Sequence, residues 1–70
     1  MSIGERIRFY RTQRGLTQQR FAEKLFVSSQ AVSKWENGHS IPDILTIARI
    51  AGVLGVSCDD LILGADGSLL

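Results

Sequence analysis

Two short segments with the apolar spacing of amphipathic helices follow each other with almost no chain between them. The first ends its apolar stripe at Leu25, and the second has Val32 and Trp35 three residues apart on one face. Only Phe26 and Val27 separate the two predicted helices. Helices joined so tightly cannot lie antiparallel side by side. The sequence therefore predicts a steep angle between them and an outward-facing N-terminal half for the second helix.

Capping residues and glycines mark the boundaries of the neighbouring helices. The first helix has its apolar face at Ile3, Ile7 and Tyr10, and Gly15 suits the C′ position after its end. Asn37 and Gly38 form a dipeptide that ends the third helix. Side chains that suit an N-cap precede three further helices, at Thr17, Ser28 and Ser57.

A fourth helix is predicted between Pro42, placed at or near its first turn, and Gly55 at its end. We expect this helix to bury a wide apolar face, formed by Ile44, Leu45, Ile47, Ala48, Ala51 and Leu54. A short fifth helix has Ser57 and Asp60 at the spacing of a capping box and Gly64 after it. The predicted fold is all-α, a compact five-helix bundle with one domain over residues 1–64 and a C-terminal tail over residues 65–70.

The composition limits the chemistry of the chain. Apolar residues make up 44% of it, which is enough for a compact domain and too much for disorder. With one cysteine, Cys58, and one histidine, His39, neither an internal disulfide nor a cysteine-based zinc site can form. We expect no metal or cofactor, and a reduced, cytoplasmic setting. The N-terminus lacks the pattern of a signal peptide, and the apolar segment 44–56 is too short to cross a bilayer.

Charge is distributed unevenly along the chain. The net charge is only +1, but residues 1–41 contain seven Lys or Arg against three Asp or Glu. Residues 42–70 contain one against four. Such polarity lets a basic face attract phosphate while the acidic part faces away or toward a partner. Arg6, Arg8 and Arg14 fit a solvated face and phosphate contact equally well.

The outward positions of the third helix indicate contact with bases. Val32 and Trp35 are expected in the core, which leaves hydrogen-bonding side chains of low charge on the outer side. The major groove of B-DNA admits one α-helix, where Gln pairs with adenine, Lys with guanine, and Ser with several partners. The predicted base contacts are Ser29, Gln30, Ser33 and Lys34.

The segment 16–38, LTQQRFAEKLFVSSQAVSKWENG, resembles the helix-turn-helix of the phage-repressor family, also called the Cro or XRE family. The later stretch LGVS.D.LI fits the same pattern, so the resemblance covers residues 3–64. It implies a lambda-repressor-like DNA-binding domain of five helices, usually dimeric, whose third helix, residues 28–37, enters the major groove.

The family pattern also implies roles for individual residues. Gln18 is expected to hydrogen-bond a DNA phosphate, and the loop after the third helix is expected to approach the DNA backbone with Asn37, His39 and Ser40. Arg11 and Glu36 match positions that often form an internal ion pair.

The chain departs from the pattern at three positions. Phe26 stands where the family usually has Gly at positive φ, which costs strain and leaves open a differently shaped turn. Arg20 replaces a common Glu near a helix N-terminus, an unfavourable place for a cation unless phosphate lies nearby. We therefore add Arg20 to the predicted phosphate contacts. Phe9 lies off the apolar stripe of the first helix, as an exposed ring or a contact for another domain.

These observations favour sequence-specific binding of double-stranded DNA by a transcriptional regulator, with repression as the default for the family. The resemblance implies a homodimer on a roughly palindromic operator, and we expect the fifth helix and the tail to form its interface. The alternative is a protein-interaction module, such as an antitoxin or the docking domain of a larger regulator. No set of catalytic residues is present, so we do not expect an enzyme.

Overall fold

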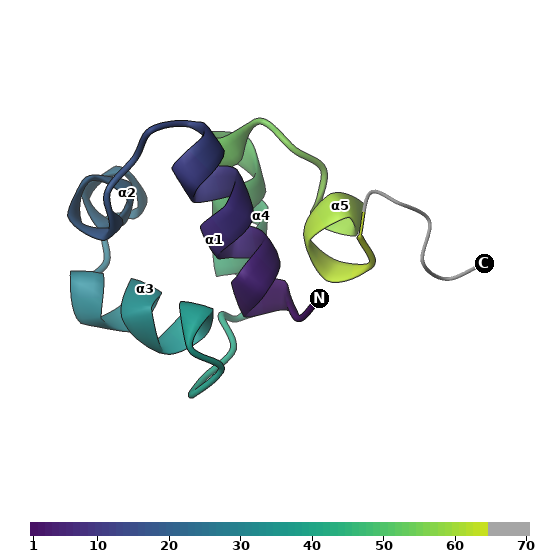
Figure 1. Cartoon of the computed structure of the whole chain (residues 1–70), viewed down its shortest axis with the longest axis horizontal. Helices are drawn as coiled ribbons and strands as arrows, with labels where there is room; N and C mark the ends of the chain where they lie inside the picture. The colour runs from purple at the N-terminus through teal and green to yellow at the C-terminus, as the bar shows by residue number, and fades with distance from the viewer. Residues whose placement is uncertain (65–70) are drawn as a thin grey trace.

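A computed structural model describes residues 1–64, in which the backbone forms five α-helices and no strand (Figure 1). They are α1 (Ile3–Gln13), α2 (Gln18–Leu25), α3 (Ser29–Glu36), α4 (Ile44–Leu54) and α5 (Cys58–Ile62). The prediction of an all-α, five-helix bundle is confirmed. The predicted tail, residues 65–70, lies outside the described residues.

Each helix begins at a side chain that accepts a hydrogen bond from a backbone N–H of the first turn. The predicted caps Thr17, Ser28 and Ser57 all do so, and Asp60 completes the capping box of α5. The predicted start of α4, at Pro42, was two residues early. Its N-cap is Asp43, because a carboxylate can accept the orphan N–H of the first turn, whereas the preceding proline cannot.

The core gathers one stripe of side chains from every helix. Val32 and Trp35 are buried there, as expected. The buried residues of α1 and α2 pack against α3, α4 and α5 in one cluster. The apolar residues with the lowest exposure are Ile7, Phe21, Ala22, Leu25, Val32, Trp35, Ile47, Ile50, Ala51, Leu54 and Leu61.

The expected wide apolar face of α4 was partly wrong. Its buried stripe is Ile47, Ile50, Ala51 and Leu54, at the i, i+3, i+4, i+7 spacing that faces α1, α2 and α5. Two of the predicted residues, Leu45 and Ala48, lie off that stripe and are exposed. Ile44 lies on the stripe, but in the first turn, where it stays 69% exposed because the neighbouring helices do not cover it.

Glycine at position 4 lets α1 and α3 approach closely. A Cβ atom built there would lie 2.0 Å from the backbone oxygen of Trp35, a distance that real Cβ atoms do not show. The start of α1 is thus packed directly on the last turn of α3. Nothing in the local sequence pattern indicates this contact, because it joins segments about thirty residues apart.

Arg6 fixes the end of the bundle. Its guanidinium donates to the backbone oxygens of Leu61 and Ile62 in α5, and to that of Met1. The carbonyls at a helix C-terminus lack partners inside the helix, so a cation that binds them satisfies both charge and hydrogen bonding. The Arg6 guanidinium is therefore occupied by hydrogen bonds within the protein.

Candidate nucleic-acid interface

The connection between α2 and α3 sets the geometry of the candidate site. Leu25 ends α2, Phe26 follows with φ 59° in the left-handed region, and Ser28 caps α3. The N–H of Val27 donates to the oxygen of Ala22 at 3.1 Å and closes the turn. In Figure 1, α2 is seen end-on while α3 lies across the view, which confirms the steep angle that the short connection predicted.

The turn keeps the left-handed conformation even though phenylalanine replaces glycine. The sequence left a differently shaped turn open, but the backbone at Phe26 has φ 59° and ψ 40°. It is the only non-glycine residue with positive φ among residues 1–64. The closing hydrogen bond and the tight packing of both helices enforce the left-handed conformation at Phe26. The backbone strain of that conformation therefore persists in the folded protein.

Helix α3 lies at the edge of the molecule (Figure 1). Val32 is fully buried and Trp35 is 7% exposed, so the helix is held from behind. Gln30 and Lys34 are exposed, and Ser29 and Ser33 are partly exposed. The structure thus brings all four predicted base-contacting residues to one accessible face.

A buried ion pair fixes α3 against α1. The guanidinium of Arg11 donates to Glu36 through two bonds, Nε to Oε2 at 2.7 Å and Nη2 to Oε1 at 3.0 Å. Its Nη1 donates to the backbone oxygen of Leu16 at 2.7 Å. This is the ion pair that the family resemblance implied. Because bidentate geometry is directional, it sets the orientation of α3 as well as its position.

Gln18 joins the same network from the start of α2. Its Nε2 donates to Oε1 of Glu36 at 3.1 Å. An amide nitrogen has two hydrogens, so one donor remains for a further acceptor. The predicted phosphate contact of Gln18 is therefore compatible with this bond, which places the side chain beside the last turn of α3.

The remaining predicted phosphate contacts form two exposed groups. Arg20 lies in the first turn of α2, and its side chain has no hydrogen bond or ion pair within residues 1–64. Asn37, His39 and Ser40 follow α3 and are all exposed. The Asn37 amide donates to the Ser33 hydroxyl at 3.3 Å, which links this loop to the outer face of α3. The Gln18–Glu36 bond brings the start of α2 close to the same end of α3.

Exposed apolar side chains near α4 and α5 were missed at the sequence level. Ile41, Ile44 and Leu45 are 74%, 69% and 72% exposed and surround the start of α4. Ile62 and Leu63 at the end of α5 are 41% and 39% exposed. The sequence did contain a signal for the exposure at α4. Its first turn carries more apolar residues than one buried stripe of a helix can accommodate.

The described part of the chain holds few groups for other chemistry. Across residues 1–64, no three His, Cys, Asp or Glu side chains come together as a metal site would require. Cys58 is half-buried and has a free thiol. None of the five helices is long and apolar enough to cross a membrane.

Known proteins similar to this chain share its helical pattern. The sequence profile of a family described as helix-turn-helix matches residues 7–61. An uncharacterized HTH-type transcriptional regulator, the SPbeta prophage-derived YonR of Bacillus subtilis, is 41% identical over 62 residues, covering 89% of this chain and 57% of that protein. The HTH-type transcriptional activator BcrR of Enterococcus faecalis is 36% identical over 66 residues, covering 94% and 32%. The chain thus spans about half or less of the length of these two relatives.

Solved structures match the fold over most of both chains. The P22 c2 repressor in complex with a synthetic operator has a TM-score of 0.87 and 30% identity, covering 91% of this chain and 97% of that one. SinR, a master regulator for biofilm formation solved in complex with DNA, has a TM-score of 0.80 and 33% identity, covering 84% and 95%.

Proposed function

Because the chain belongs to the helix-turn-helix family of the phage-repressor type, we propose that it binds double-stranded DNA sequence-specifically as a transcriptional regulator, with repression as its mode. It acts in the cytoplasm as a binding module rather than as an enzyme, and needs no cofactor. Helix α3 lies in the major groove, and the side chains at both ends of the α2–α3 unit contact phosphates.

One observation carries this proposal: the outer face of α3 is polar, accessible and rigidly supported. Gln30 and Lys34 are exposed, while Val32, Trp35 and the Arg11–Glu36 pair hold the helix from behind. Base edges are distinguished by hydrogen bonds whose geometry must be fixed in advance, so a firmly supported helix suits this task. The DNA present in the two solved structures described above supports the same assignment.

Phosphate contacts give the protein its register on the duplex. Gln18 and Arg20 lie at the start of α2, and Asn37, His39 and Ser40 follow α3; the Gln18–Glu36 bond brings the two groups close to the same end of the exposed helix. Such contacts supply affinity and orientation but carry no sequence information. The assignment of base contacts to Ser29, Gln30, Ser33 and Lys34 completes the proposed interface.

We propose that a homodimer places two copies of α3 in successive major grooves, about 34 Å apart, so that the operator is roughly palindromic. The exposed apolar residues support such an interface, because apolar side chains left on the surface of a small domain favour association. Ile62 and Leu63 belong to the expected α5 interface. Ile41, Ile44 and Leu45 are further exposed apolar residues, at the start of α4, that the sequence analysis did not assign to an interface.

The test begins with selection of bound duplexes from a random pool, with the mass of the complex measured at the same time. We expect a palindromic consensus and two chains per duplex. Gln30→Ala or Lys34→Ala should then relax the preference at one base pair of each half-site and cost about 1–3 kcal/mol of binding free energy. Gln13→Ala, which removes an exposed amide from the end of α1, is the matched control and should leave the preference intact. Equal affinity for the selected and a scrambled duplex would contradict the proposal.

Salt dependence separates this function from the protein-interaction alternative. DNA binding releases counterions from each neutralised phosphate, so affinity should fall steeply as salt rises. Arg20→Glu should weaken binding to every duplex by a similar factor and reduce the salt slope. An affinity that does not change with salt would favour an antitoxin or docking domain instead.

A further inference from the structure

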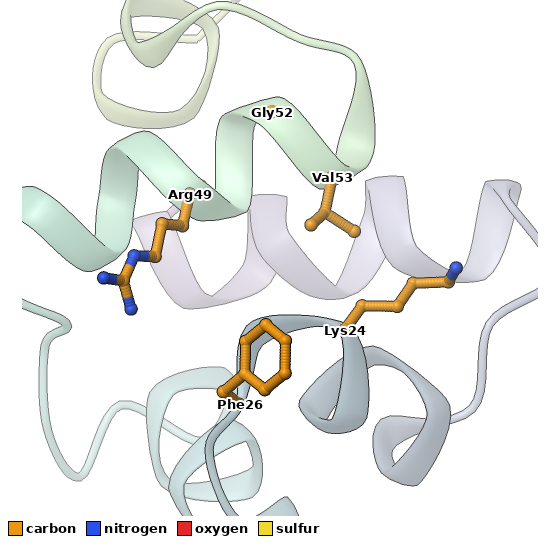
Figure 2. Close-up of a pocket in the computed structure, with 5 residues that line it drawn as sticks. All are labelled: Lys24, Phe26, Arg49, Gly52 and Val53. Atoms are coloured by element: carbon orange, nitrogen blue, oxygen red, sulfur yellow. The ribbon is translucent and has the colours of Figure 1, made fainter.

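A shallow hollow of about 550 Å³ lies between the end of α2 and the second half of α4. It is lined by Lys24, Phe26, Arg49, Gly52 and Val53. Figure 2 shows the Phe26 ring between the two cationic side chains, with Val53 directed toward it from α4. None of the nine residues predicted to contact bases or phosphates belongs to this lining. We call it the α2–α4 hollow.

The fold strains Phe26 without burying its side chain. Its backbone lies in the left-handed region at φ 59°, where a side chain is strained. The residue is 91% exposed, so the fold gains almost nothing from burying its ring. The strain therefore falls on a residue that packs against little in the free protein. Backbone outliers that survive such costs concentrate at binding sites.

The charges at the rim are available to a partner. Lys24 and Arg49 are exposed, and neither side chain has a hydrogen bond or ion pair within residues 1–64. The exposed Gly52 leaves the α4 side open, because a Cβ atom built there would meet nothing within 4 Å. The surface therefore combines an aromatic ring and a valine with two exposed cations, of which Arg49 also interacts electrostatically with the Asp43 carboxylate.

We propose that the α2–α4 hollow binds an acidic peptide segment of another protein, one that inserts an apolar side chain between carboxylates. The apolar side chain would pack on Phe26 and Val53, and the carboxylates would pair with Lys24 and Arg49. Aromatic residues and arginine are the types enriched at the centre of protein interfaces. A DNA backbone fits less well, since it would leave the ring and Val53 exposed to water and phosphates. The proposal is independent of whether α3 binds DNA.

The probes are three short synthetic peptides with a central leucine, flanked by aspartates, by lysines or by serines. Each is titrated into the ¹⁵N-labelled chain, and amide chemical shifts are followed. We expect only the aspartate peptide to shift the amides of the α2–α4 hollow in a saturable way. Phe26→Ala should weaken this binding about tenfold. The double variant Lys24→Glu with Arg49→Glu should abolish it, and Arg8→Glu, an equal charge change on exposed α1, is the control that should bind normally.

Three results would overturn the proposal. The first is no saturable shift at the hollow with the aspartate peptide. The second is equal binding of the lysine peptide, which would remove the role of the two cations. The third is a duplex of random sequence that shifts the same amides and displaces the peptide, which would assign the hollow to DNA. Circular dichroism spectra of the variants verify folding, which exposed substitutions of this kind are expected to preserve.

Discussion

Replacing Phe26 by glycine should make the domain more stable, although it removes a large apolar side chain. The left-handed conformation costs a non-glycine residue about 1–2 kcal/mol. The ring is 91% exposed, so its removal sacrifices little buried surface. Glycine adds flexibility to the unfolded chain, which costs about 0.4–1 kcal/mol. The difference predicts a gain of about 0.5–1 kcal/mol in the free energy of unfolding.

The gain can be measured by urea unfolding followed through the fluorescence of Trp35, the only tryptophan and 7% exposed. The midpoint should rise with an unchanged m-value, because the surface exposed on unfolding stays nearly the same. In thermal unfolding the midpoint should rise by about 2–8 °C for a domain of this size.

Phe26→Ala is the matched control, because alanine also removes the ring but keeps the strain of positive φ. It should give none of the gain that glycine gives. If alanine stabilises the domain as much as glycine, the exposed ring and not the backbone is the source of the cost. If glycine destabilises the domain, the ring makes contacts that its 91% exposure does not indicate, and the reasoning fails.

Three further predictions concern stability, and each is measured by chemical or thermal unfolding. Gly4→Ala should lower the free energy of unfolding by about 1–3 kcal/mol, because the new Cβ would lie 2.0 Å from a backbone oxygen of α3. As its control, Gly52→Ala in an open part of α4 should raise the free energy of unfolding by about 0.5–1 kcal/mol. Glu36→Gln should cost about 3–5 kcal/mol by leaving the Arg11 guanidinium buried without its counter-charge, and a loss below 1 kcal/mol would contradict this role. The Asp43 carboxylate accepts a backbone N–H, which lowers its pKa below the ordinary 3.8. The ionised Asp43 carboxylate therefore stabilises the fold fully above pH 3.8, and this stabilisation is lost as the pH falls through the lower pKa of the folded state. The difference in unfolding free energy between the parent and Asp43→Asn should accordingly shrink as the pH is lowered.

Local signals in the sequence were enough to predict the helices and their order. A cap such as Ser28 bonds a backbone N–H three residues away, and the bond depends on nothing else in the fold. Val32 and Trp35 lie three residues apart, so their common inward direction follows from helical periodicity. The outward direction of Gln30 and Lys34 follows from the same periodicity.

The tertiary structure decided the features that depend on contacts between distant segments. The position of Gly4 on the last turn of α3 and the exposure of Ile44 both depend on which helix covers which. From the sequence, Arg6 fitted a solvated face or a phosphate contact, and only the placement of the end of α5 showed that it bonds to the protein itself. Phe26 could have reshaped the turn, but the packing of two helices enforced a conformation that its own preference opposes. The reason is the separation along the chain of the residues involved. Caps and helical periodicity join residues within about one helical turn, whereas close packing joins residues from every helix of the bundle.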